Sequence, residues 1–492
     1  MAFLGGLFRT KDAARLKAEA ETNAHRLKRV LGPMDLVALG IGGVIGAGIF
    51  ALVGTAAAGD AARPGAGPAI VVSFLITGLC CAFAGLCYAE FASVVPISGS
   101  AYTYAYATLG ELVAWIIGWD LILEYAVGNV AVAVSWSGYF CELLRGFGLE
   151  FPRWLATDLR TALHTPEILA QAPRILGVPI AFNLPAFFIV AFLTTILVLG
   201  IRESARFNAV MVGIKLLVLG FFVFVGLAYV RPENWHPFAP NGWSGIQAGA
   251  AVIFFAYIGF DAVSTAAEEC RRPERDLPIG ILGSLAVCTV IYIVVAAVLT
   301  GMVPWNLLNT AEPLSVAMRG VQMDWAAGIV AFGSVIAHTA VLLVFQLGQP
   351  RIFFSMARDG LLPPAFARVH PRYKTPHVTT LLSGLFVGGT ACFASLDEMA
   401  DLCNIGTLSA FFIVCAGILV LRYRDPLRPR PFRTPFVPVV PLLGMAACLY
   451  LMLGLPLTAW IRFGVWLLAG LALYFAYGFS RSRLRREPAA PA

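Results

Sequence analysis

Five glycines lie within nine residues of the first long apolar segment, and their spacing could expose backbone groups for chemistry. They are Gly40, Gly42, Gly43, Gly46 and Gly48. Each glycine weakens a helix by about 1 kcal/mol relative to alanine. The segment can therefore either pack closely against a neighbouring helix, or break and free backbone N–H and C=O groups to bind a ligand. The glycines alone do not distinguish these two alternatives.

A second apolar segment, residues 254–261, places Gly259 and Asp261 near its middle. Two interrupted spans five helices apart are the pattern of an inverted repeat with a binding site at its interface. The positive end of one half-helix can face a carboxylate, and the free carbonyls of the other can hold an ammonium. Such a pair would recognise the constant part of an α-amino acid. The two halves show no clear sequence identity, so the repeat is inferred from hydropathy and breaks alone.

Ionisable residues inside apolar segments are candidates for proton chemistry. Lys215 can act inside the bundle, or it can snorkel to the nearby interface. Asp120 and Glu124 are four residues apart and share a helix face, where they can hold structure by hydrogen bonds or transfer protons. Asp261 can cap the half-helix that follows it or take part in coupling. Glu90 can tie the second span to a loop.

The composition requires elements that cross a membrane. Hydrophobic residues make up 59% of the 492-residue chain and charged residues only 13%, whereas a soluble domain carries about 25% charge. The apolar residues form blocks of about 20, enough to cross a hydrocarbon core of roughly 30 Å, and lipid favours helices. We predict twelve spans: about residues 34–58, 69–94, 112–140, 182–199, 209–230, 245–267, 279–303, 325–354, 378–393, 400–421, 437–456 and 461–479.

The basic residues predict the orientation of these spans. With the N-terminus in the cytoplasm, the inner segments hold 26 Lys and Arg residues and the outer segments eight, while Lys215 lies within a span. This bias places both termini inside and the loop 141–181 outside. The net charge of +7 is thereby explained by topology, so we expect no nucleic-acid partner. Residues 11–29 form either an amphipathic surface helix or a solvated tail.

The expected fold is an all-α membrane protein. It has a five-plus-five inverted repeat with broken helices 1 and 6, followed by two C-terminal helices. The predicted boundaries are an N-terminal tail over 1–33, a first repeat over 34–231, a second over 244–422, helices 11 and 12 over 435–480, and a tail over 481–492. No metal-ligand or nucleophile constellation is visible, so we expect no cofactor, no metal and no enzyme. A channel is disfavoured because broken helices within one chain favour alternating access.

Several motifs carry a family resemblance. The stretches 40–50, 88–93, 99–104, 118–125, 255–269 and 358–363 resemble bacterial members of the cationic amino acid transporter family. That family belongs to the amino acid–polyamine–organocation superfamily. The resemblance covers about residues 30–480 in order, and it is specific for fold and class but weak for cargo.

The resemblance implies a backbone binding site for the cargo. The cargo carboxylate would meet the chain around Gly46, Ala47 and Gly48, next to Ile45. Its ammonium would meet carbonyls near Val44, Phe255, Ala256 and Ile258. Ala47 stands where relatives often have a hydroxyl residue, so one side-chain hydrogen bond to the carboxylate is expected to be missing.

The same resemblance bears on coupling and on cargo size. It favours a proton-coupling role for Lys215, whose ammonium would tie the first span to the eighth. Phe345 in the eighth span would shorten the side-chain pocket; the alternative is ordinary core packing.

The expected function is secondary active amino acid transport in the cell inner membrane, by proton-coupled symport of small or neutral L-amino acids. The alternative is a transporter or exchanger of arginine, lysine or polyamines. The expected partners are the amino acid, protons and the lipid bilayer; a small membrane subunit is an open possibility.

Overall fold

The computed structural model describes residues 7–11, 30–60, 63–94, 100–175, 178–200, 205–373 and 375–486. Helices dominate these ranges. Strands within them are limited to two short antiparallel hairpins, β1 (Gly59–Asp60) with β2 (Arg63–Pro64), and β3 (Arg174–Ile175) with β4 (Val178–Pro179). The surface helix or tail proposed for residues 11–29 falls almost entirely outside the described residues.

The first span is broken. Helix α3 (Pro33–Val44) begins with a proline at its first position, where the missing N–H costs nothing, and the Asp35 carboxylate accepts a hydrogen bond from the Gly32 N–H at 2.8 Å. A π-helix η1 (Gly48–Leu52) and α4 (Val53–Ala58) continue the span after the break, bent by 48° from α3. The helix break, one of the two alternatives for the glycine cluster, is therefore present.

The rest of the first half consists of long helices and one structured loop. The helices are η2 (Gly67–Ala69), α5 (Ile70–Val94), α6 (Ser100–Thr108), α7 (Glu111–Gly146), α11 (Leu184–Val198) and α12 (Ala205–Leu227). The loop expected over 141–181 begins only after α7 ends at Gly146. It carries α8 (Arg153–Ala156), α9 (Leu159–Leu163), α10 (Pro166–Gln171) and the β3–β4 hairpin.

The second half begins with another broken span. It comprises α13 (Gly242–Ile253), η4 (Phe254–Tyr257), α14 (Ala262–Thr265) and η5 (Ala267–Glu269), preceded by η3 (Pro232–Trp235). The helices that follow are α15 (Pro273–Met302), η6 (Trp305–Leu307), α16 (Pro313–Gly320), α17 (Asp324–Arg358), η7 (Pro364–Ala367), α18 (His377–Ala391) and α19 (Leu396–Arg424). The last are α20 (Val439–Leu453), α21 (Leu457–Leu473), η8 (Tyr474–Gly478), α22 (Phe479–Arg481) and α23 (Arg483–Arg486).

Length and hydropathy support several membrane crossings. In the described residues, eight helices are long and apolar enough to span a bilayer, and α3 with Gly48–Ala58 makes a ninth if the bent pair is one span. Helices α11 and α20 are shorter apolar helices, and α18 covers most of the predicted ninth span. Each of the twelve predicted ranges thus falls on helix, whereas the crossing of the bilayer by all twelve stays a prediction.

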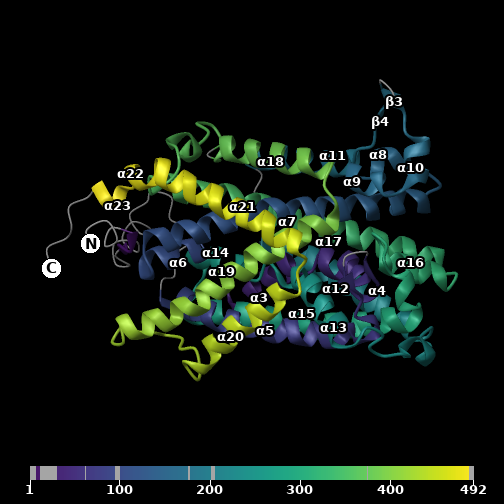
Figure 1. Ribbon diagram of the computed structural model, residues 1–492, viewed down its shortest axis with the longest axis horizontal. Helices are drawn as coiled ribbons and strands as arrows, with labels where there is room; N and C mark the ends of the chain where they lie inside the picture. Colours follow the sequence, from purple (N-terminus) through teal and green to yellow (C-terminus); the bar gives the residue numbers. More distant parts are fainter. Residues whose placement is uncertain are drawn as a thin grey trace.

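The packing encloses the two broken spans. Helix α7 lies along α17 and α19, and α15 lies along α5 and α3 (Figure 1). Large apolar side chains face outward on the surrounding helices, including Phe224 on α12 at 80% exposure and Leu468 on α21 at 68%. An outward apolar surface of this kind suits lipid rather than water.

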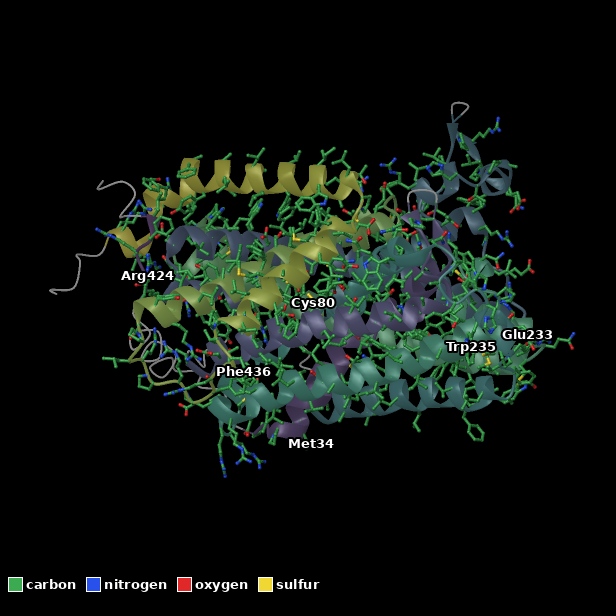
Figure 2. All side chains as sticks on the ribbon, turned by 60° about the horizontal axis from the view of Figure 1, so that its bottom comes forward. Met34, Cys80, Glu233, Trp235, Arg424 and Phe436 are labelled. Carbon is green, nitrogen blue, oxygen red and sulfur yellow. The ribbon has the colours of Figure 1, made fainter. Side chains whose placement is uncertain are left out.

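The two ends of the bundle carry different segments. Helices α6, α22 and α23 lie at one end, and the β3–β4 hairpin with α8–α10 lies at the other (Figure 1). Arg424 and Glu233 likewise mark opposite ends, with Cys80 near the middle (Figure 2). These described parts of the segments predicted to be cytoplasmic therefore lie at the opposite end of the bundle from the loop predicted to be outside.

A buried carboxylate fastens the α19–α20 loop to α5. Glu90 is fully buried and receives hydrogen bonds from Nε and Nη2 of Arg422, at 3.0 and 2.9 Å. Arg430 lies 3.3 Å away, and the Thr434 N–H donates to Glu90 at 2.7 Å. The predicted tie between Glu90 and a loop is confirmed.

Candidate functional site

The first break leaves helix termini in the buried centre of the bundle. The Ile45 N–H still donates to the Ile41 carbonyl at 3.0 Å, but Ile45 itself is extended, with ψ 103°. The chain resumes a helix at Gly48, and the Phe50 N–H donates to the Gly46 carbonyl at 3.2 Å. The first N–H groups of a helix have no intrahelical acceptor and form its positive end. The backbone around Gly46, Ala47 and Gly48 can therefore receive an anion.

The second break leaves carbonyl groups. After η4, Ile258 is extended and Gly259 has φ +112°, a conformation that glycine adopts without a steric penalty. The Ile258 N–H donates to the Phe255 carbonyl at 3.3 Å. The chain then turns into α14. Carbonyls around Phe255, Ala256 and Ile258 thus lie at a helix end in the buried interior and can receive a cation.

Glycines let the two breaks touch. A Cβ atom on Gly48 would lie 2.2 Å from the Cα of Ala256, and one on Gly259 would lie 2.8 Å from the carbonyl oxygen of Gly43. No side chain fits between the two backbones at these points. The two explanations offered for the glycine cluster, close packing and a break, are therefore both correct.

Lys215 reaches the first break from α12. Its side chain is fully buried, and its Nζ donates to the carbonyls of Gly42 at 2.5 Å and Ile45 at 3.0 Å. The snorkelling alternative is therefore wrong in this structure, because the ammonium points into the bundle. Lys215 instead holds the last carbonyls of α3, where a cation is favoured by the helix dipole.

Tyr292 on α15 was not identified from the sequence. Its hydroxyl lies 3.0 Å from the Val44 carbonyl and 2.8 Å from the Ala256 carbonyl. These are two of the carbonyls expected to meet the cargo ammonium, one from each break. The available signal was a phenol in the middle of an apolar span, which requires a hydrogen-bond partner when buried.

The acidic candidates gather beside the second break. Asp120 and Glu124 of α7 are each 1% exposed and Asp261 is 2% exposed. Both carboxylate oxygens of Asp120 and Oε1 of Glu124 lack a hydrogen-bond partner among the described groups, so a structural hydrogen-bonding role is not supported for Asp120. Of the two alternatives for Asp261, the cap is wrong: its side chain makes no cap to α14 and lies 3.5 Å from the Tyr125 hydroxyl.

Phe345 lies on the α17 face that approaches the first break. A Cβ on Gly46 would lie 2.8 Å from Val341, and Phe345 is four residues further along the same face. The Phe345 ring is 3% exposed and packs on Tyr125 at a centroid distance of 5.3 Å, beside Gly128. It therefore lies between α7 and the site, a position compatible with both pocket closure and core packing.

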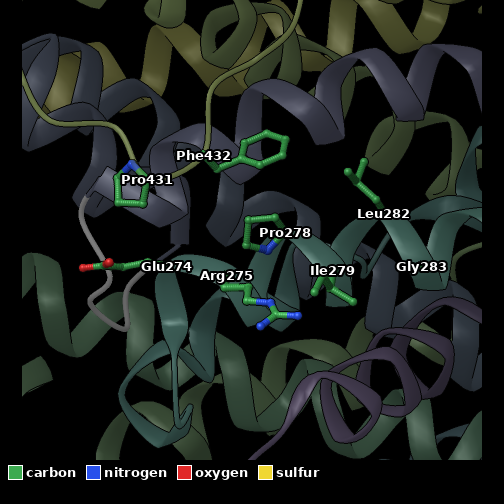
Figure 3. Close-up of a pocket in the computed structure, with 8 residues that line it drawn as sticks. All are labelled: Glu274, Arg275, Pro278, Ile279, Leu282, Gly283, Pro431 and Phe432. Carbon is green, nitrogen blue, oxygen red and sulfur yellow. The ribbon is translucent and has the colours of Figure 1, made fainter.

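Cavities are also present away from the breaks. A cleft of 550 Å³ forms between the start of α15 and the α19–α20 loop (Figure 3). Its lining comprises Glu274, Arg275, Pro278, Ile279, Leu282, Gly283, Pro431 and Phe432. A smaller one of 380 Å³ lies near Arg160, Phe393 and Glu398. Among the described residues no group of three or more His, Cys, Asp or Glu side chains could hold a metal ion.

A bundle of apolar helices with two facing breaks at its centre is the architecture of a polytopic membrane transporter. The chain belongs to the amino acid permease family, whose model matches residues 31–473. The predicted membership of the amino acid–polyamine–organocation superfamily is thereby confirmed.

Three relatives illustrate the range of this family. The chain is 46% identical to the methylthioribose transporter of Bacillus subtilis, and 47% identical to the branched-chain amino acid permease BcaP of the same organism. Both matches cover 98% of this chain and 100% of the relative. It is 38% identical to the vacuolar cationic amino acid transporter 4 of Arabidopsis thaliana, over 86% of this chain and 68% of the relative.

Proposed function

We propose that this protein is a secondary active transporter that carries small or neutral L-amino acids together with protons by alternating access. The observation that carries the proposal is the contact between the two helix breaks, in which the start of the Gly48–Ala58 helical segment lies against the backbone of Ala256. A positive helix end beside a group of carbonyls matches the carboxylate and ammonium of an α-amino acid.

The cargo would bind mainly to backbone groups. N–H groups near Gly46, Ala47 and Gly48 would receive the carboxylate, and carbonyls near Val44, Phe255, Ala256 and Ile258 would receive the ammonium. Phe345 would limit the length of the side chain. The branched-chain permease among the relatives supports a neutral apolar cargo.

A cationic amino acid or polyamine is the second candidate. Asp261 lies three residues after Ile258 and is buried at 2% exposure, so a carboxylate is present next to the second break to meet a cationic side chain. Cationic amino acid transporters among the relatives support the same alternative. Methylthioribose, the cargo in the name of another relative, has neither carboxylate nor ammonium. It would therefore need contacts with the breaks other than those proposed for an amino acid.

Proton coupling is assigned to Lys215, with Asp120, Glu124 and Asp261 as further candidates. When protonated, Lys215 stabilises the end of α3 through its two carbonyl bonds. Loss of the proton would weaken this contact and favour rearrangement of the first break. Protons are then linked to conformation if Lys215 binds them differently in the two access states.

We also propose an architecture of two inverted repeats, each of which begins with a broken span. Residues 34–231 and 244–422 form the two inverted repeats, and the segment 435–480 adds two helices. The protein lies in the cell inner membrane. Both of its termini face the cytoplasm, in agreement with the distribution of basic residues.

Uptake by purified protein in liposomes tests the proposal. A panel of radiolabelled neutral, cationic and acidic amino acids is offered with and without an inward proton gradient. We expect saturable uptake of small or branched neutral amino acids that the gradient increases. Preferential uptake of arginine or lysine would favour the second candidate, and no uptake of any amino acid by folded protein would contradict transport of both neutral and cationic amino acids.

A further inference from the structure

The hydroxyl of Tyr292 joins the two helix breaks. It is 3.0 Å from the carbonyl oxygen of Val44, where α3 ends, and 2.8 Å from that of Ala256, inside η4. A phenol has one proton to donate, so it serves the two carbonyls alternately or shares the proton between them. An aliphatic residue at this position could make neither contact.

The surroundings hold this hydroxyl in place. Tyr292 is fully buried, and its ring packs at 5.4 Å from the rings of Phe74 on α5 and of Tyr257 on η4. The Tyr257 hydroxyl in turn donates to the Phe74 carbonyl at 3.0 Å. The Tyr292 hydroxyl is therefore positioned by a rigid aromatic cluster rather than by a mobile side chain.

The two carbonyls need a donor whenever they are buried. Val44 is 3% exposed and Ala256 is 1% exposed, so water does not cover this region. A buried carbonyl without a donor is unfavourable, and its penalty corresponds to a population change of roughly tenfold or more. The ammonium of an amino acid can supply donors while cargo is bound, but a symporter must also return after the cargo has left.

We propose that Tyr292 is a positioning residue that replaces the cargo ammonium when the transporter returns without cargo. This inference rests on the proposed function. The phenol donates to Val44 and Ala256 while the two breaks close over each other, and the arriving ammonium displaces it. Tyr292 therefore favours net transport, in which the unloaded protein must change its access state, over exchange, in which it is always loaded.

Comparison of net uptake with exchange tests this role. Tyr292→Phe keeps the ring and removes only the donor. We expect net uptake into liposomes without internal amino acid to fall about tenfold or more, while exchange against internal amino acid stays within about twofold of the wild type. Binding of the cargo should be as tight as in the wild type or tighter, because the ammonium no longer competes with a phenol.

Tyr257→Phe is the matched control. It removes a buried phenol-to-carbonyl hydrogen bond from the same cluster, but this bond joins η4 to Phe74 on α5 and does not join the two breaks to each other. Net uptake and exchange should change together in this variant. An equal loss of both in folded Tyr292→Phe, or no loss of net uptake, would overturn the proposal.

A second substitution tests the same role if Tyr292→Phe does not fold. 3-Fluorotyrosine at position 292 keeps the ring and the hydroxyl and makes the hydroxyl a stronger donor. We expect the apparent affinity for cargo to fall several-fold while net uptake is retained, and an unchanged affinity would overturn the proposal. A wild-type protein that moves no amino acid in either assay would instead contradict the proposed function.

Discussion

The ammonium of Lys215 lies 2.5 Å from the carbonyl oxygen of Gly42, two residues before α3 ends at the first helix break. A second bond of 3.0 Å to Ile45 places the same charge on the residue that leaves the helix. Any change in the charge of Lys215 therefore acts directly on the backbone proposed to hold the cargo.

Lys215→Ala should uncouple transport from the proton gradient. An inward gradient of about two pH units supplies about 2.7 kcal/mol per proton, and the variant should lose most of the resulting accumulation while still binding cargo. Lys215→Arg should fail as well, because arginine does not release its proton. Leu217→Ala, on the lipid-facing side of the same helix at 74% exposure, is the control. Accumulation by Lys215→Ala equal to that of the wild type would rule out this role.

Phe345→Ser should widen the range of cargo. Removing the ring that packs on Tyr125 leaves space beside α7, so longer amino acids such as arginine should compete for uptake. The cavity should also lower stability by about 3 kcal/mol, which requires measurement of folded protein by thermal unfolding. Phe463→Ser on α21, a buried aromatic at 8% exposure outside the proposed repeats, should lower stability without altering the cargo range. An unchanged cargo range in folded Phe345→Ser would support core packing alone.

Gly48→Ala should push the two breaks apart. The new Cβ would lie 2.2 Å from the Cα of Ala256, and no side-chain rotation relieves a clash with the backbone. We expect lower thermal stability and loss of transport. Gly464→Ala on α21 meets nothing within 4 Å and should raise helix stability by up to about 1 kcal/mol. Normal transport by Gly48→Ala would show that the two backbones are not in contact in the working protein.

Glu90→Gln should loosen the α19–α20 loop. The substitution removes the charge that Arg422 and Arg430 share in a fully buried position, and breaking such a pair costs about 3 kcal/mol. Limited proteolysis within residues 425–438 would detect the loosened loop, and thermal unfolding would measure the loss of stability. Glu398→Gln changes a carboxylate that is 31% exposed and pairs with Arg160 and Arg462, so its effect should stay below about 1 kcal/mol. Equal stability losses in the two variants would contradict a special role for Glu90.

The helix breaks could be predicted from the sequence because glycine acts locally. Five glycines in a short stretch weaken any helix there, whatever surrounds it, and Gly259 adopts a φ that disfavours other residues. Packing of the breaks against each other required the structure, since it depends on how α3 and η4 are placed by α15 and α5.

The positions of the side chains around the breaks were harder to predict from the sequence. Lys215 lies close enough to a helix end for the sequence to allow snorkelling, and only the three-dimensional path of α12 directs it to Gly42 and Ile45. Tyr292 was missed because a single tyrosine in an apolar span gives no indication of which carbonyl it meets. The position of Asp261 after the break allows a helix cap as well as a coupling role, and only the structure shows that its carboxylate lies near the Tyr125 hydroxyl of α7.

Competition for uptake tests whether the two breaks recognise the ammonium and carboxylate that all α-amino acids share. Leucine, N-acetyl-leucine, leucine methyl ester and methylthioribose are each added to wild-type protein in liposomes taking up radiolabelled leucine. We expect leucine alone to compete strongly, because each leucine derivative lacks the charged ammonium or the carboxylate and methylthioribose lacks both. Competition by methylthioribose or by either leucine derivative as strong as that by leucine would contradict recognition of the amino acid by the backbone of the two breaks.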